Sequence, residues 1–207
     1  MFVVYSGKRG TGKTYHAICD IKKALEQGKK VYVNFHVDFR KLFPDLPHEN
    51  CLYFENLDDL AYMRDCLMIF DEAHSDLSSW DWQSMPKRQR EYLALSRHIH
   101  VDIIFISQDI KRLNTVAREL TEGVIEHHVF GGRYNDKKKQ YSKTWFFWTS
   151  EFMPKEIDNV KRFSLANSFI RFDKNIASCY DTDELFGELL KQLPPKIFAP
   201  SYEPNKL

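Results

Sequence analysis

The sequence lacks any long hydrophobic run. No uncharged apolar stretch approaches the ~18 residues that a helix needs to cross a bilayer. A cleavable signal peptide is also missing, because Met1 leads directly into a short apolar stretch typical of a first strand. We therefore expect a soluble protein that carries neither a membrane-spanning helix nor an ordinary secretion signal.

Cysteine is scarce, and the net charge is close to zero. The 4 cysteines form no Cys-x-x-Cys pair, and no histidine stands at zinc-site spacing from them. The pattern therefore argues against a disulfide framework or a structural metal and favours reduced thiols. Lys and Arg number 30 against 29 Asp and Glu, which leaves a net charge of +1. The chain as a whole has no strong attraction to nucleic acid or to an anionic membrane, so any basic binding surface must be local.

Glycine is infrequent, yet three of the 8 glycines lie close together near the amino terminus. They belong to a segment that fits the phosphate-binding pattern G-x-x-x-x-G-K-[ST] without a mismatch. Successive backbone N–H groups can wrap a polyphosphate only where the chain lacks Cβ atoms. We expect Lys13 to reach the β- and γ-phosphates of ATP and the Thr14 hydroxyl to ligate Mg²⁺. The predicted nucleotide-binding residues are Gly7, Lys8, Arg9, Gly10, Thr11, Gly12, Lys13 and Thr14.

The context of this segment supports the prediction. Residues 2–5 are apolar and typical of a strand, and residues 15–27 repeat apolar side chains at helical spacing. Another apolar, β-branched stretch follows at 30–35. Strand, loop, helix and strand in this order predict a right-handed crossover and a parallel sheet. A glycine-rich turn that fits the pattern by chance would not need these neighbours.

A second acidic motif follows the apolar residues 66–70. Asp71 and Glu72 come directly after this predicted buried strand, at the end where ligands bind in parallel sheets. The arrangement is the Walker B pattern. We expect Asp71 to hold Mg²⁺ together with Thr14, and Glu72 to polarise the water that attacks the γ-phosphate. The alternative is a strand that ends in a solvated acidic turn.

Residues 101–108 predict a further buried strand with polar residues at its end. Gln108 is positioned either to sense the γ-phosphate and orient water, with weaker help from Ser107, or to cap the following helix. We predict that helix at 109–121. Shorter elements are expected at 51–54 (strand), 57–64 (helix), 86–98 (helix), 167–173 (strand) and 183–193 (helix).

The sequence pattern changes after Gly123. Two strands, at 124–130 and 141–149, flank a polar connection and predict a hairpin appended to the parallel sheet at 123–150. Its tip carries Arg133 and the run 137–139, a basic cluster that either grips DNA phosphates or is simply solvated. We expect residues 1–193 to form one domain of the α/β class. Residues 194–207 form a proline-rich tail or linker.

The two motifs, together with Ser96 to Gln108, resemble one branch of the P-loop ATPases. The chain resembles the zonular occludens toxin (Zot) domain that is shared with the gene I assembly proteins of filamentous phages. In that family an Arg-His pair, here Arg97 and His98, is followed by a small residue, an Asp and an apolar strand that stops at Thr-Gln. This sequence departs from the pattern at His100, where the family usually has Gly, and at Ser107, where it usually has Thr.

The resemblance implies an ATPase that drives assembly and extrusion of filamentous virions from the inner membrane. It implies a P-loop NTPase fold, ATP and Mg²⁺ as cofactors, and a homo-oligomeric ring in the host cytoplasm. Phage coat or assembly proteins and single-stranded DNA are the implied partners. Such rings complete the active site with a neighbour's arginine, for which Arg97 and Arg118 are candidates. Members commonly continue into a membrane helix, so this chain is expected to be either a cytoplasmic part or a soluble variant.

Two other functions are compatible with the sequence. One is an ATPase that packages or translocates duplex DNA, of the FtsK/HerA type. The other is a non-catalytic nucleotide-binding scaffold or a secreted effector that binds a host partner. The presence of Glu72 and Gln108 argues against a dead site, and the missing signal peptide argues against ordinary secretion.

Overall fold

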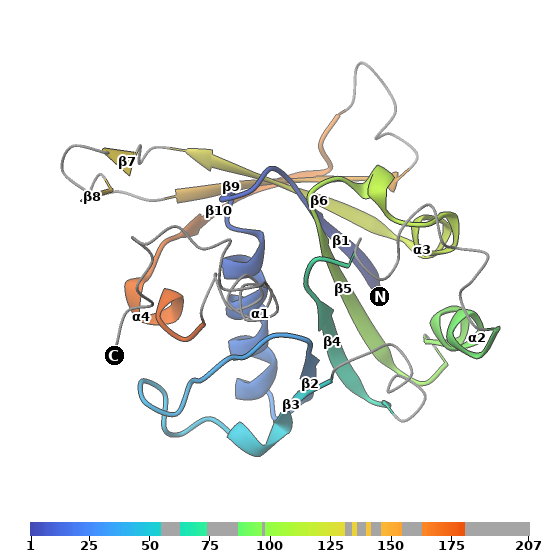
Figure 1. The fold of residues 1–207 in the computed structure, drawn as a ribbon, viewed down its shortest axis with the longest axis horizontal. Coiled ribbons are helices and arrows are strands. Elements are labelled where there is room, and N and C mark those ends of the chain that lie inside the picture. The colour runs from blue at the N-terminus through green and yellow to red at the C-terminus, as the bar shows by residue number, and fades with distance from the viewer. Residues whose placement is uncertain are drawn as a thin grey trace, which may run out of the picture.

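The computed structural model describes residues 1–54, 63–73, 87–96, 98–130, 134–135, 140–141, 146–154 and 163–180. In these residues a mixed β-sheet carries helices on both faces (Figure 1). The described elements follow in the order β1 (Phe2–Ser6), α1 (Lys13–Glu26), β2 (Lys30–Val33), the 3₁₀ turn η1 (His48–Asn50), β3 (Cys51–Tyr53), β4 (Cys66–Phe70), α2 (Lys87–Leu95), β5 (Val101–Ser107), the 3₁₀ turn η3 (Ile110–Arg112), α3 (Thr115–Leu120), β6 (Gly123–Phe130), β7 (Tyr134–Asn135), β8 (Gln140–Tyr141), β9 (Phe146–Phe152), β10 (Ala166–Arg171) and α4 (Lys174–Ala177).

The main sheet of the described chain has the strand order β10-β9-β6-β1-β5-β4-β2-β3. From β6 to β3 all neighbouring strands are parallel, whereas β9 and β10 are antiparallel to their neighbours. The order inserts β5 between β1, which leads into the glycine loop, and β4, which leads into Asp71. Parallel pairing brings the carboxyl ends of these three strands to one edge of the sheet, where ligands bind in folds of this kind.

Two apolar cores lie on opposite faces of the sheet. Along β1, Phe2 and Val4 pack toward the face covered by α2 and α3, while Val3 and Tyr5 pack toward α1 (Figure 1). Every residue of β1 and β4 is buried. A strand buried on both faces has a continuous apolar sequence instead of an alternating one, and this is the pattern that the sequence shows.

Most predicted strands of the main sheet are confirmed with small changes at their ends. The strand predicted at 30–35 ends at Val33, and the one predicted at 167–173 is β10 (Ala166–Arg171). The helix predicted at 86–98 is α2 (Lys87–Leu95). The helix predicted at 183–193, the tail at 194–207 and most of the helix predicted at 57–64 lie outside the described residues.

The single helix predicted at 109–121 is wrong. The chain forms the short turn η3, passes through extended backbone at Leu113, and begins α3 only at Thr115. The Asn114 side chain accepts a hydrogen bond from the Ala117 N–H at 2.8 Å, which starts a new helix at that point. Asp109 caps η3 in the same way through Lys111. Side chains that bond to the local backbone therefore override the apolar periodicity.

The antiparallel addition to the sheet is confirmed, but its second strand is shifted. The strand predicted at 141–149 is β9 (Phe146–Phe152), which pairs with β6 on one side and β10 on the other. Between β6 and β9, the short strands β7 and β8 pair with each other in a ladder of their own. The reason for the shift is that Phe146 to Glu151 find a second partner in β10, whereas residue 141 pairs across the connection with Tyr134.

The family departure at His100 coincides with unusual backbone geometry. His100 has a φ of 55°, in the left-handed region that glycine enters without steric cost. Asp65, which precedes β4 as His100 precedes β5, has a φ of 48°.

Within the described ranges, none of the helices is long and apolar enough to cross a membrane.

Candidate nucleotide-binding site

The glycine-rich loop connects β1 to α1 at the carboxyl edge of the sheet. Gly12 precedes α1 with a φ of 87°, and a Cβ at this position would lie 2.5 Å from the Phe147 ring of β9. Gly7 has a φ of 143°, and its Cβ would lie 2.6 Å from the His127 carbonyl oxygen of β6. Both positions therefore require glycine for conformation and for space. The antiparallel strand β9 therefore packs against the loop through Phe147.

Lys13 lies inside this loop. Its side chain is largely buried, and Nζ donates hydrogen bonds to the carbonyl oxygens of Gly7 at 2.8 Å and Lys8 at 3.0 Å. Burial lowers the pKa of the Lys13 ammonium, although the negative charges of Asp71 and Glu72 oppose this shift. Phosphate oxygens are charged acceptors and bind an ammonium more strongly than carbonyl oxygens do. The lysine is therefore held where a phosphate can replace its internal partners.

Thr14 and Asp71 are in direct contact. The Thr14 hydroxyl donates a hydrogen bond to Asp71 Oδ2 at 2.8 Å, although the two residues are 57 positions apart. Burial raises the pKa of the Asp71 carboxyl, and the hydrogen bond from Thr14 opposes that shift. A hydroxyl beside a partly buried carboxylate is an oxygen donor pair that suits Mg²⁺. The residues predicted to share the metal are thus brought together in a fitting arrangement.

Glu72 follows Asp71 in a strained backbone conformation. Its φ is 50°, and its N–H donates to Asp71 Oδ1 at 2.8 Å. The next residue, Ala73, donates its N–H to the Ile106 carbonyl of β5 at 2.9 Å. Non-glycine residues in the left-handed region gather at active sites, where surrounding contacts impose the conformation. Here the strain falls on the residue predicted to activate water.

The other predicted catalytic residues that the structure describes bond to neighbours close in sequence. Gln108 lies just beyond β5, where its Oε1 accepts a hydrogen bond from Arg112 at 3.2 Å, across the η3 turn. The Ser107 hydroxyl donates to the Asp109 carbonyl at 2.9 Å. Arg118 lies on α3 and contacts the Thr115 hydroxyl at 3.4 Å. Arg97, the other arginine candidate, lies outside the described residues.

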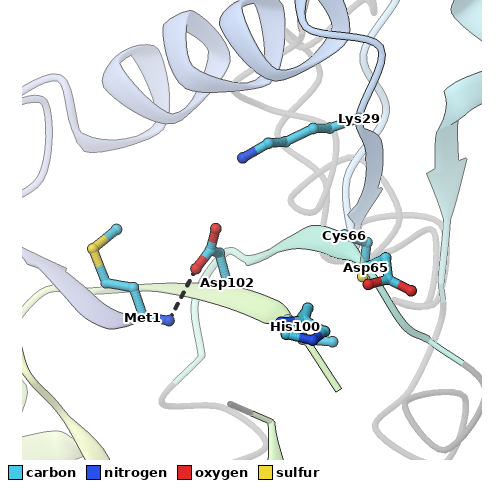
Figure 2. A pocket seen from close by; sticks show the side chains of 7 residues that line it. Met1, Lys29, Asp65, Cys66, His100 and Asp102 are labelled. Atoms are coloured by element: carbon cyan, nitrogen blue, oxygen red, sulfur yellow. Dashed lines mark hydrogen bonds and ion pairs between the residues drawn. The ribbon is translucent and has the colours of Figure 1, made fainter. Parts of the chain in front are cut away.

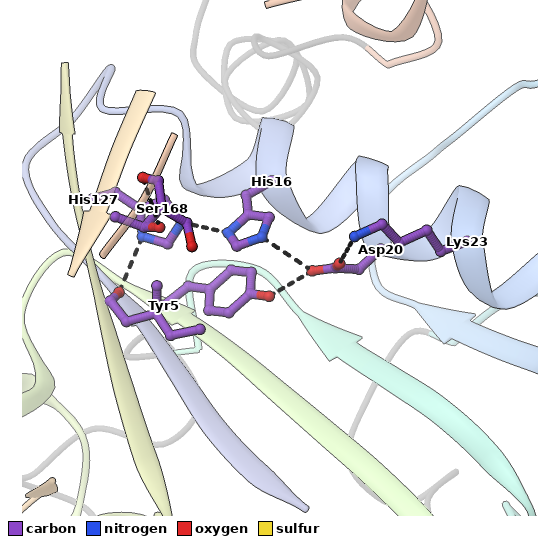
Figure 3. Close-up of polar contacts among 8 residues, drawn as sticks. Tyr5, His16, Asp20, Lys23, His127 and Ser168 are labelled. Atoms are coloured by element: carbon purple, nitrogen blue, oxygen red, sulfur yellow. Dashed lines mark hydrogen bonds and ion pairs between the residues drawn. The ribbon is translucent and has the colours of Figure 1, made fainter. Parts of the chain in front are cut away.

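A pair of histidines, of which His127 is buried and His16 half-buried, lies beneath the loop and was not identified from the sequence (Figure 3). His127 Nδ1 faces the carbonyl oxygens of Ile125 at 3.0 Å and Ser6 at 3.3 Å. Because carbonyls only accept, Nδ1 carries the hydrogen, and Nε2 accepts one from His16 Nδ1 at 2.9 Å. Burial lowers the pKa of His127 to about 3. The adjacent residue, His128, lies on the other face of β6 and is exposed.

Asn34 is a second residue that the sequence analysis did not identify. It follows β2, and its side chain makes two hydrogen bonds to the backbone of Asp71. The available signal was a polar residue near the end of the strand predicted at 30–35, which ends at Val33 in the structure. The strand order was needed to use it, because only the pairing of β2 with β4 brings residue 34 to residue 71.

A cavity of about 380 Å³ lies at the opposite edge of the sheet (Figure 2). It is lined by residues at the amino ends of β1, β4 and β5, including Met1, Cys66 and Val101. The amino group of Met1 is paired with Asp102 at 2.9 Å, so charges of both signs neutralise each other there. Its lining includes no residue of the glycine-rich loop. That loop and the acidic pair lie at the carboxyl edge of the sheet.

Several residues singled out in the sequence lie outside the described ranges. These residues form the hairpin-tip cluster of Arg133 and 137–139. The hypothesis of DNA contact at the hairpin tip therefore stays a prediction.

Comparison with known proteins finds a matching family and solved structures with a similar fold. The family model described as "Zonular occludens toxin (Zot)" matches residues 1–184. A similar solved structure is the N-terminal domain of zonular occludens toxin from Neisseria meningitidis, with 18% identity, a TM-score of 0.53, and coverage of 87% of this chain and 98% of that one. B204, the DNA-packaging ATPase from Sulfolobus turreted icosahedral virus, has 13% identity, a TM-score of 0.50, and coverage of 81% and 95%.

No curated protein matches the chain. At identities this low the structural likenesses show the fold alone, which is that of a P-loop NTPase. The family model covers most of the chain, from the first strand past the last described one. The chain therefore belongs to the zonular occludens toxin (Zot) family.

Proposed function

We propose that this Zot-family protein is an ATP-hydrolysing motor for the assembly and extrusion of filamentous virions. The observation that carries the proposal is the 2.8 Å contact between the Thr14 hydroxyl and the Asp71 carboxylate, beside the buried Lys13. This contact brings the phosphate-binding segment and the acidic pair together in one site. Membership of the Zot family supports the biological role that we propose.

Each site residue has one task in this proposal. The loop N–H groups and the Lys13 ammonium bind the phosphates, with Nζ exchanging the carbonyls of Gly7 and Lys8 for phosphate oxygens. Thr14 and Asp71 would hold Mg²⁺, which when bound neutralises charge on the phosphates. Glu72 orients the attacking water and takes its proton. Gln108 is a candidate phosphate sensor, and Arg97 or Arg118 a candidate for insertion into a neighbour's site.

The partners follow from the same role. We propose that the chain works as a homo-oligomeric ring on the cytoplasmic side of the host membrane. Its cargo would be coat protein, single-stranded DNA, or the two together during export. Phage assembly proteins would couple the ring to the exit site.

The test is ATP hydrolysis by the wild type, Lys13→Ala and Glu72→Gln, each with single-stranded DNA, with duplex DNA and without DNA. We expect a Mg²⁺-dependent wild-type activity and a loss of at least about 100-fold in both variants. Lys13→Ala removes a charge that stabilises the transferring phosphoryl group, and Glu72→Gln removes the base for the attacking water. Both variants should keep the wild-type melting temperature. Hydrolysis at the parental rate by Lys13→Ala would refute the assigned site.

A duplex-DNA packaging ATPase is the second candidate. The fold likeness to B204, at a TM-score of 0.50, is the observation in its favour. This function predicts strong stimulation by duplex DNA that decreases steeply with salt, because phosphate contacts release counterions. Stimulation by single-stranded DNA or coat protein alone would favour the virion motor. A non-catalytic scaffold would instead keep its partner binding and biological function in Glu72→Gln.

A further inference from the structure

The side chain of Asn34 clamps the peptide backbone of Asp71. Its Nδ2 donates to the Asp71 carbonyl oxygen at 3.0 Å, and its Oδ1 accepts from the Asp71 N–H at 2.7 Å. Only a carboxamide can donate and accept in this way from one side chain of this length. A carboxylate would keep the acceptor and lose the donor, and an aliphatic side chain would lose both.

The clamp is aligned by the sheet. Val33 pairs with Ile69 in the parallel ladder of β2 and β4, so Asn34 comes level with the end of β4. The hydrogen bonds of Asn34 therefore extend the pairing of β2 with β4 beyond its last backbone pair, with the Asn34 side chain replacing the backbone of β2. The Asp71 peptide is held on its β2 side at the point where regular pairing stops.

The β5 side of the same turn is also held. The Ala73 N–H donates to the Ile106 carbonyl at 2.9 Å, and the Glu72 N–H donates to Asp71 Oδ1. Between these anchors lies Glu72, with its left-handed φ of 50°. A residue in this conformation persists only where its surroundings determine it. Asn34 provides the anchor on one side, and β5 provides the other.

We propose that Asn34 is a positioning residue for the Asp71–Glu72 pair. Its carboxamide fixes the Asp71 peptide, which directs the Asp71 carboxylate toward Thr14 and sets the direction in which Glu72 leaves the turn. In this proposal Asn34 acts on the Asp71 backbone and not directly on the nucleotide or the attacking water. The part that concerns Glu72 rests on the proposed ATP hydrolysis, whereas the part that concerns Asp71 rests on metal-dependent nucleotide binding alone.

The first experiment measures the affinity of the full chain for a non-hydrolysable ATP analogue, with Mg²⁺ and with EDTA. The wild type should bind more tightly with Mg²⁺. Asn34→Leu should lose about tenfold or more of that gain while its affinity in EDTA stays within about threefold, as happens when a group that orients a metal ligand is removed. Asn34→Ser, in which the hydroxyl is too short to reach both backbone groups, is the second variant if Asn34→Leu does not fold.

Asn50→Leu is the matched control. Asn50 also donates its side-chain amide to a backbone carbonyl, that of Gly28 at 3.2 Å, but it lies before β3, at the edge of the sheet away from the loop. Its replacement should leave the Mg²⁺-dependent gain and kcat unchanged. Thermal unfolding of all variants separates local from global effects.

The second experiment is a double-mutant cycle on kcat. Asn34→Leu should lower kcat by about 10- to 100-fold in the wild-type background. In the Glu72→Gln background it should change the residual rate by less than about threefold, because the residue to be positioned is already disabled. Full multiplication of the two effects would mean that Asn34 does not act through Glu72 and would overturn the proposal. An unchanged Mg²⁺-dependent gain in Asn34→Leu would overturn it equally.

The two experiments separate this proposal from the proposed function. A wild type that hydrolyses no ATP defeats the motor. The affinity measurement then still decides whether Asn34 positions Asp71.

Discussion

At the scale of single residues, backbone strain marks three places in the described chain. Glu72, His100 and Asp65 are non-glycine residues with a positive φ. Glu72 lies at the candidate site, whereas His100 and Asp65 line the cavity at the opposite edge of the sheet (Figure 2). The strain at Glu72 has a function in our proposal. The strain at His100 serves no residue of the nucleotide site and can therefore be relieved without affecting it.

We predict that His100→Gly stabilises the protein. A left-handed conformation costs a non-glycine residue about 1–2 kcal/mol, and glycine returns part of this through its greater freedom in the unfolded chain. The net gain in the free energy of unfolding should be about 0.5–1 kcal/mol, measured by urea denaturation, with ATP affinity unchanged. His98→Gly is the control, because His98 has no positive φ and should gain nothing. Equal gains in both variants would contradict this explanation.

At the scale of elements, local capping decides where the helix after β5 begins. Asn114 is almost fully buried, and its side chain starts α3 by accepting the Ala117 N–H. The Thr121 hydroxyl donates to the Ala117 carbonyl at the other end of the same short helix. Because α3 has only 6 residues, most of its stability must come from its ends and its packing, not from helix propensity.

We predict that Asn114→Ala lowers the free energy of unfolding by about 1–2 kcal/mol through loss of the cap. Asn114→Ser should keep most of the stability, because its hydroxyl can accept the same N–H. The measurement is the urea midpoint at constant slope. If alanine and serine proved equally destabilising, loss of packing volume would be the cause and not loss of the cap.

At the scale of the whole molecule, the sheet and α1 are joined through a chain of buried and half-buried polar side chains. The His16–His127 contact links α1 to β6, and Tyr5 of β1 hydrogen-bonds to Asp20 of α1 (Figure 3). Tyr5 also stacks on His16, with ring centres 4.6 Å apart. Burial lowers the pKa of both histidines, and that of His127 falls to about 3. The folded protein therefore keeps His127 neutral at pH values where the unfolded chain takes up a proton.

We predict that stability falls as the pH drops below about 6.5, the ordinary histidine pKa. Between about 6.5 and the folded-state value of about 3, the unfolded chain binds more protons. Stability therefore rises with pH in this window, and His127 contributes a slope of about 1.4 kcal/mol per pH unit. Above pH 6.5 its contribution is complete and constant. The measurement is the free energy of unfolding against pH for the wild type and His127→Gln. The variant should lose the contribution of His127 to the slope and keep that of His16, whose pKa is also lowered by burial.

His128→Gln is the control for that measurement. His128 is the adjacent residue but is exposed on the other face of β6. Its replacement should leave the slope in pH unchanged. A slope that disappears equally in both variants would show that the buried position of His127 is not the cause.

The sequence alone determined the glycine loop, the acidic pair and the strands that lead into them. Gly7 to Thr14 and Asp71–Glu72 are identified by residue type and spacing, because a phosphate cradle and a metal ligand at a strand end need those residues in that order. The buried strands are also local information, since an apolar run of this length suits a strand that is covered on both faces. The end of η3 and the start of α3 were not found, because side-chain bonds at Asp109 and Asn114 override periodicity.

Only the tertiary structure decided which strand ends meet. The order of strands places β5 between β1 and β4 and β2 beyond β4, and no sequence spacing encodes that order. The contacts of Thr14 with Asp71, His16 with His127 and Asn34 with Asp71 all depend on it. The physical reason is that a motif is fixed by short-range backbone geometry, whereas a contact between distant residues is fixed by how the sheet buries its two faces.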